Sequence, residues 1–95
     1  MKICALCGRE IPPGAETKHH LVPRSMGGSN GDNVVDLHNI CHKQVHALFS
    51  RYDLATIYNT IGRLKQTKRI RKFLKWVENK PIHFDKKIRK SKKYR

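Results

Sequence analysis

Two short motifs of equal spacing constrain what this chain can fold into more than any other feature of its sequence. Cys4 and Cys7 are separated by two residues, and so are His38 and Cys41. Together they supply three thiolates and one imidazole, a complete tetrahedral ligand set for zinc. Sulfur ligands favour zinc over magnesium or calcium, and a full shell leaves no open position. The sequence therefore predicts a structural Zn²⁺, worth on the order of 10 kcal/mol or more in zinc-finger peptides.

The small size of the chain is consistent with a need for such a metal. Its 95 residues, 38% of them hydrophobic, indicate one domain with a limited core. An odd number of cysteines, two of them so close together, suits a metal better than a disulfide framework. His42 is a second candidate for the fourth ligand. Consecutive helical residues point roughly 100° apart, however, so Cys41 and His42 are expected to serve different sites.

The N-terminus and the apolar runs bear on where the protein works. The first motif begins at Cys4, which leaves no room for a signal peptide. No apolar run approaches the roughly 18 residues that span a bilayer. We therefore expect a soluble, cytoplasmic protein in a reducing compartment, with no membrane partner.

Turn residues and apolar spacing predict an α+β fold in three parts. The apolar pieces 21–23 and 34–37 are too short for helices and flank a loop rich in Gly, Ser and Asn, as in a hairpin. A helix is expected from about residue 39 to 49. Residues 1–50 would form a zinc-stabilised core, residues 51–82 a helical extension packed on it, and residues 83–95 a basic, flexible tail.

The extension is expected to hold two helices. Apolar residues recur at helical spacing from Leu54 to Leu64, behind Asp53 as a fair N-cap. Thr67 or a neighbour is expected to start the second helix, with basic residues on its outer side. We expect Trp76, because of its helical setting, to lie in the core.

Four further histidines fall into two pairs. His42 and His46 stand four apart on the predicted helix, which puts their rings on one face, with Cβ atoms roughly 6 Å apart, close enough to chelate one ion. His19 and His20 are adjacent where the hairpin begins, so one ring can bind the ion while the other faces elsewhere. Taken singly, each histidine fits a plain surface position better than it fits the role of a ligand.

The order of these motifs resembles a known family. From Cys4 to His46 the chain shows Cys-x-x-Cys, His-His-x-x-Pro, Gly-Gly, Asn and Cys-His-x-x-x-His, covering about half of its length. This order is similar to the zinc-containing branch of the HNH endonucleases. The resemblance implies a treble-clef-like ββα-metal core, followed here by helices, and an enzyme that hydrolyses DNA phosphodiester bonds.

The resemblance also implies roles for individual residues. His20 would be the general base, taking a proton from the attacking water, and an imidazole titrating near pH 6.5 suits that role. Asn33 would be a hydrogen-bonding brace, although the segment 31–33 is equally compatible with a plain turn. One catalytic divalent ion would be held by His19, His42 and His46.

The identity of that ion stays open. Many family members carry Asp as the first ligand and four cysteines around the zinc, and this chain departs from both patterns. Three imidazoles suit Zn²⁺, Ni²⁺ or Mn²⁺, whereas Asp and Asn variants favour Mg²⁺. The family implies products with 5′-phosphate and 3′-hydroxyl ends. One such site cuts one strand, so a monomer would nick and a homodimer could cut both strands.

The charge balance indicates a polyanionic partner. Lys and Arg number 21 against 7 acidic residues, a formal net charge of +14, and double-stranded DNA is the expected partner. Basic side chains of this kind give salt-dependent affinity rather than base readout. The candidate phosphate contacts, near the proposed site or on the extension, are Lys18, Arg24, Lys43, Arg69 and Lys72.

Two other functions remain open. A non-catalytic zinc-finger module that binds DNA would need neither His20 nor the pair His42 and His46. A nuclease for RNA or structured nucleic acid would have the same site as a DNA endonuclease, and only substrate tests separate the two.

Overall fold

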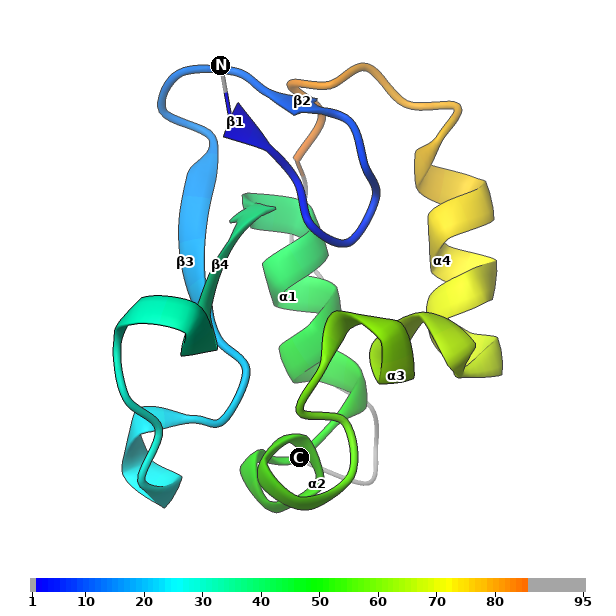
Figure 1. Cartoon of the computed structure of the whole chain (residues 1–95). Helices are drawn as coiled ribbons and strands as arrows, with labels where there is room; N and C mark the ends of the chain where they lie inside the picture. The colour runs from blue at the N-terminus through cyan, green and yellow to red at the C-terminus, as the bar shows by residue number, and fades with distance from the viewer. Residues whose placement is uncertain (1, 86–95) are drawn as a thin grey trace.

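A computed structural model describes residues 2–85 and shows the expected α+β class (Figure 1). Two small antiparallel hairpins come first, and four helices follow. The strands are β1 (Lys2–Ile3), β2 (Glu10–Ile11), β3 (Glu16–His20) and β4 (Val34–His38). The α-helices are α1 (Asn39–Leu48), α2 (Arg51–Thr56), α3 (Ile61–Gln66) and α4 (Lys68–Val77), and the loop between β3 and β4 holds the 3₁₀ turns η1 (Arg24–Met26) and η2 (Gly31–Asn33).

The larger hairpin pairs β3 with β4, and His20 opposes Val34 where the ladder ends. The expected first strand at 21–23 was therefore wrong, because the chain leaves the sheet after His20. The side chain of Asn33 accepts a hydrogen bond from the Val22 N–H and donates one to the Val22 carbonyl. Since the following Pro23 has no N–H to donate, the ladder cannot continue past this point.

Helix α1 follows β4 directly, and its position confirms the helix expected at 39–49. Its buried face carries Ile40, Cys41 and Val45 at helical spacing. In Figure 1, α1 runs beside the β3–β4 hairpin, which places the candidate metal ligands of α1 close to those of the hairpin.

The single helix expected over 54–64 is instead two helices, α2 and α3, separated by residues 57–60. Helix α2 begins three residues earlier than predicted, because the N-cap is Ser50 and not Asp53: the Ser50 hydroxyl accepts from the Asp53 N–H at 3.1 Å. Thr60 caps α3 in the same way. Thr67 caps α4, as expected.

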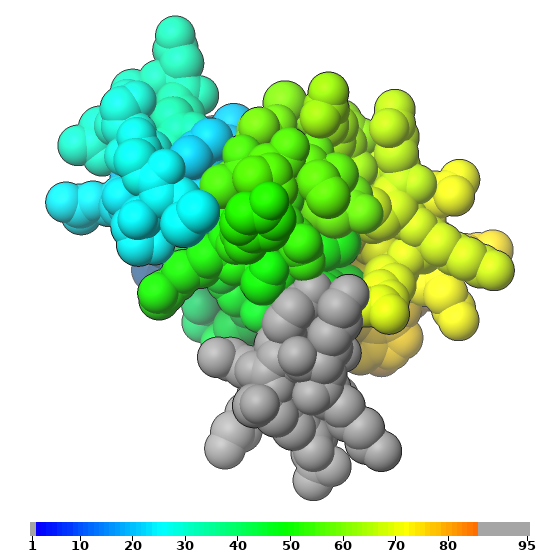
Figure 2. All heavy atoms as spheres, turned by 90° about the horizontal axis from the view of Figure 1, so that it is seen from below, coloured from blue at the N-terminus to red at the C-terminus, as the bar shows by residue number. Residues whose placement is uncertain are grey.

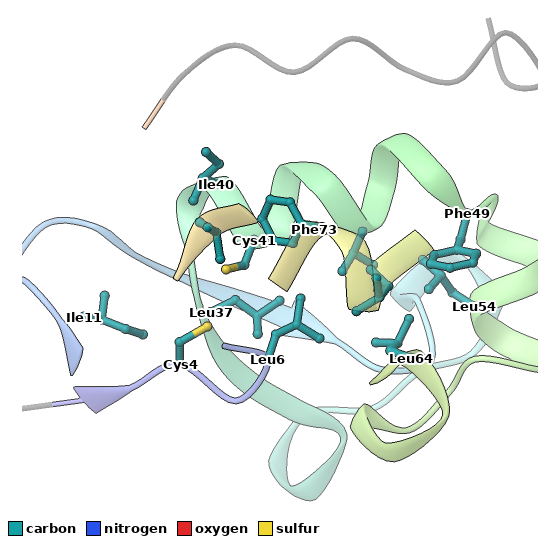
Figure 3. Close-up of a cluster of buried hydrophobic side chains, with 13 residues drawn as sticks. Cys4, Leu6, Ile11, Leu37, Ile40, Cys41, Phe49, Leu54, Leu64 and Phe73 are labelled. Carbon is teal, nitrogen blue, oxygen red and sulfur yellow. The ribbon is translucent and has the colours of Figure 1, made fainter. Parts of the chain in front are cut away.

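One buried cluster joins the N-terminal and C-terminal parts of the described chain. It runs from Leu6 and Leu37 to Leu54, Leu64 and Val77, and Figure 3 shows side chains from the first hairpin, β4, α1 and the later helices meeting in it. The sulfurs of Cys4 and Cys41 lie at one end of this cluster (Figure 3). The apolar packing thus holds the extension against the ligand-bearing elements.

Trp76 is not a core residue: it is 38% exposed and packs with its ring 5.7 Å from that of Phe84. Phe84 and Asp85 fall within the predicted tail, 83–95, yet both contact the folded domain. Asp85 accepts hydrogen bonds from Asn39 and Lys43 of α1. The rest of the predicted tail, residues 86–95, lies outside the described residues. No helix within residues 2–85 is both long and apolar enough to cross a membrane.

Candidate functional site

The first cluster of metal-ligating groups is the predicted set Cys4, Cys7, His38 and Cys41. Their ligand atoms all lie within 4.8 Å of one another. His38 offers Nδ1, 3.2 Å from the Cys7 sulfur, while its Nε2–H donates to the Glu10 carbonyl at 2.8 Å. This second bond fixes the tautomer that leaves Nδ1 unprotonated, as metal-binding histidines usually require. The four groups therefore fit one tetrahedral metal ion.

The ionisation of Cys7 and Cys41 also fits a cation. Contacts with Cys4 and Cys41 lower the pKa of Cys7, while contacts with Cys4 and Cys7 raise the pKa of Cys41. Ionisation of one of these two thiols therefore disfavours ionisation of the other, since neighbouring negative charges repel one another. A bound dication removes the conflict because it favours all three thiolates.

The second cluster brings His19, His42 and His46 together. Their ligand nitrogens lie within 4.8 Å, and the Nε2 atoms of His42 and His46 are 3.1 Å apart. Two nitrogens bound to one ion at 2.0–2.1 Å in tetrahedral geometry would be about 3.3 Å apart. The cluster thus has the dimensions of a metal site.

Among these three histidines, His19 gives the strongest indication of a bound ligand. It is 0% exposed, and neither of its ring nitrogens has a hydrogen-bond partner in the described structure. Burial, with a smaller effect of the neighbouring His42 and His46, lowers the pKa of His19 to about 3. A neutral imidazole with unsatisfied buried nitrogens is costly unless something binds it, and a metal ion would satisfy it.

Thr17, on β3, fixes the orientation of His42. The Thr17 hydroxyl donates to the Leu37 carbonyl at 3.2 Å, so its oxygen accepts the Nδ1–H of His42 at 2.9 Å. His42 therefore keeps an unprotonated Nε2, the atom that faces His46. Burial lowers the pKa of His42 to about 4, which also keeps this ring neutral.

His20 lies at the end of β3 and lines an open groove with His42 and His46. Its Nε2 is 3.1 Å from the amide oxygen of Asn30, which can only accept. The ring therefore donates from Nε2 and keeps its lone pair on Nδ1. His20 is thus separate from the three-histidine cluster but shares its groove.

Asn33 does not line the groove; it holds the loop that forms one wall of it. Its side chain makes the two bonds to Val22 and donates a third to the Ser29 carbonyl at 2.9 Å. Gly28 packs so closely here that an added Cβ would lie 1.7 Å from the Val22 oxygen. The loop geometry therefore depends on an amide at 33 and on the absence of a side chain at 28.

The groove, of about 340 Å³, has cationic walls. Lys18 and Arg24 come from the hairpin side, and Arg51 comes from the first residue of α2. Helix α2 contacts η1, which brings Arg51 to the groove. Lys18 is ion-paired with Asp36, whereas Arg24 and Arg51 make no ion pair within residues 2–85.

The other predicted phosphate contacts lie away from the groove. Lys43 pairs with Asp85 at 2.9 Å on a different part of α1. Arg69 and Lys72 are exposed on α4. The structure thus brings Lys18 and Arg24 to the histidines but not the remaining three.

The family model of the HNH endonuclease matches residues 4–48. A protein of Bacillus subtilis (strain 168), described as "Uncharacterized protein YisB", is 37% identical over 79 residues, which cover 83% of this chain and 76% of that protein. The chain belongs to the HNH endonuclease family. Proteins of this family are generally nucleases, so the HNH domain indicates a nuclease-type or nucleic-acid-binding function. No solved structure matches the chain significantly.

The HNH match ends at residue 48, so α2, α3 and α4 lie beyond it. Three residues of the site were not predicted from the sequence: Thr17, Asn30 and Arg51. Thr17 and Arg51 reach the histidines only through tertiary packing, and spacing alone carries no signal for either. Asn30 lies within the Gly/Ser/Asn loop, where one amide cannot be told from another by sequence.

Proposed function

We propose that this HNH protein is a metal-dependent DNA endonuclease whose catalytic ion is held by His19, His42 and His46. The observation that carries the proposal is the groove that His20 lines together with His42 and His46 of the three-histidine cluster and with Arg24 and Arg51. A general base, a metal site and cations for phosphate in one groove are the parts that phosphodiester hydrolysis needs.

The residues of the second cluster fit a divalent ion by distance, by tautomer and by the unsatisfied nitrogens of His19. When bound, such an ion supplies Lewis-acid polarisation of a phosphoryl oxygen and stabilisation of the leaving 3′-oxygen. Three imidazoles favour Mn²⁺, Ni²⁺ or Zn²⁺ over Mg²⁺. The Cys4, Cys7, His38 and Cys41 set would hold a separate structural Zn²⁺.

His20 acts as the general base in this proposal. Its Nδ1 takes a proton from the attacking water, while Asn30 holds the ring through Nε2. Asn33 acts indirectly, because it fixes the loop that carries Arg24 and Asn30. It is thus a positioning residue, in keeping with the predicted brace.

The groove cations bind the substrate. Arg24 and Arg51 line the groove with His20, His42 and His46 and can hold the phosphate being cut or its neighbours, since a guanidinium binds phosphate through paired hydrogen bonds. The net charge of +14 adds long-range attraction for DNA.

A non-catalytic binding module explains the site less well. Such a module has no use for a buried imidazole with two unpartnered nitrogens, or for a second histidine held by a single loop amide beside it. A nuclease for RNA or structured nucleic acid remains an alternative with the same groove, and the substrate in the assay distinguishes it.

The test is cleavage of supercoiled plasmid by zinc-loaded protein with added Mn²⁺, Ni²⁺, Mg²⁺ or Zn²⁺. Three proteins are compared: wild type, His20→Ala and His83→Ala, the last being an exposed histidine outside the groove. We expect wild type and His83→Ala to nick with at least one metal, and His20→Ala to be slower by about 10²-fold or more. Equal rates for all three would refute the role of His20, and cleavage of RNA but not DNA would refute the substrate.

A further inference from the structure

A second hollow lies on the other side of α2 from the groove. It is open, has a volume of about 960 Å³, and is formed by the end of α1, α2, α3 and the start of α4. Phe49 and Tyr58 lie at its apolar part, with ring centres 4.6 Å apart. Its basic lining residues are Arg63, Lys68 and Arg69, against one carboxylate, Asp53, among the described lining residues.

Helix α2 is a short ridge between the two hollows. Arg51, its first residue, lines the groove, while Asp53 and Ile57 line the second hollow. Figure 2 shows α2 in green between the β3–β4 loop in cyan and α4 in yellow. Helix α2 has six residues and is therefore about 9 Å long. One DNA strand advances 3.4 Å per base pair, so the second hollow begins within about three base-pair steps of the groove.

We propose that this second hollow binds the phosphate backbone of the duplex beside the scissile phosphate. The helical extension, which lies outside the HNH match, would then be part of the substrate-binding surface. The inference rests on the proposed function for its substrate. Neither Lys68 nor Arg69 makes an ion pair within residues 2–85, and both are exposed. Their charges are therefore available to a polyanion.

Helix α4 supplies a matched control for this proposal. Lys68 and Arg69 line the second hollow, whereas Arg71 and Lys75 are also exposed on the same helix and do not line it. The variants Lys68→Gln/Arg69→Gln and Arg71→Gln/Lys75→Gln each remove one lysine and one arginine. Arg63 is left unchanged because its guanidinium donates to the Ile57 carbonyl and supports the chain between α2 and α3.

The experiment measures the salt dependence of binding to a 20-base-pair duplex, with both variants made in zinc-loaded His20→Ala protein so that the DNA stays intact. Each phosphate contact contributes about 0.9 to the slope of log K against log salt. We expect Lys68→Gln/Arg69→Gln to lower the magnitude of the slope by about 2. Between 50 and 200 mM salt, the affinity of this variant should then fall about 12-fold less than that of the parent His20→Ala protein. The control pair should change the slope by less than about 1.

Equal slopes for the two variants, or no change in either, would overturn the proposal. Thermal unfolding of both variants checks that each is folded. The outcome is separable from the proposed function. If the protein never cuts DNA but the slopes differ, the proposal of a second binding surface stands. If the protein cuts DNA and the slopes are equal, only that proposal is refuted.

Discussion

Replacing Thr17 by Val removes one hydroxyl from beneath the three-histidine cluster without changing the shape of the side chain. In the native structure this hydroxyl accepts the Nδ1–H of His42 at 2.9 Å while donating to Leu37. Valine leaves the Nδ1–H of a half-buried ring without its acceptor, and the ring gains freedom to turn or to change tautomer. The Nε2 of His42 is then no longer held toward His46.

The expected size of the effect follows from the chemistry of such outer hydrogen bonds. Losing the partner of a metal-binding histidine typically lowers metal affinity 10- to 100-fold, equivalent to about 1.4–2.7 kcal/mol. The fold itself should lose only about 1 kcal/mol, since one partly buried hydrogen bond is removed. Thr17→Ser keeps the hydroxyl and is the matched control, with an affinity within about threefold of wild type.

The assay is calorimetric titration of Mn²⁺ into zinc-loaded protein, together with ¹⁵N NMR of the His42 ring before metal is added. Wild type and Thr17→Ser should show the Nδ1–H tautomer, and Thr17→Val should show a mixture of the two tautomers. An unaltered Mn²⁺ affinity in folded Thr17→Val would refute the reasoning, as would an equal loss in Thr17→Ser.

Three further predictions concern the loop, the buried imidazole and the zinc ligands. Gly28→Ala should slow plasmid nicking at least tenfold and cost about 1–3 kcal/mol, because its Cβ would lie 1.7 Å from the Val22 oxygen; nicking at the wild-type rate would contradict the close approach. His19 has a pKa of about 3 when folded and about 6.5 when unfolded, so unfolding takes up a proton between these values and stability falls as the pH drops below 6.5. In urea unfolding between pH 5 and 6.5, His19→Leu should flatten this fall by an average of about 1.1 kcal/mol per pH unit, and a slope equal to that of wild type would count against a neutral His19. Cys41→Ser should reduce bound zinc well below one ion per chain and lose helical circular dichroism, and a folded, zinc-free variant would show that the metal is not structural.

Spacing was sufficient to predict the zinc-ligand set Cys4, Cys7, His38 and Cys41 and the pair His42 and His46. The assignment of His19 rather than His20 to the second cluster came only from the family resemblance. Two residues between ligands bring both to one knuckle or helix turn, and the i, i+4 spacing of His42 and His46 puts them on one helix face. The helix that follows the hairpin was also predictable from the sequence, since α1 carries a clear apolar face.

The errors arose where side chains override the apolar pattern. The strand ends at His20 because Asn33, eleven residues after Val22, hydrogen-bonds both the N–H and the carbonyl of Val22. No apolar pattern records such a bond. The early start of α2 did have a signal, because Ser50 stands three residues before the acidic Asp53, a typical capping arrangement. The break before α3 likewise follows a threonine cap, Thr60, which helical periodicity alone passes over.

The most direct test of the central claim is one titration of Mn²⁺ into zinc-loaded wild-type protein, with nicking rate and bound metal measured in each sample. Our account predicts that nicking rises to a plateau at one Mn²⁺ per chain while zinc stays at one per chain, since the two clusters are separate sites. Full nicking with no second ion, or a bound second ion with no nicking of DNA, would contradict it.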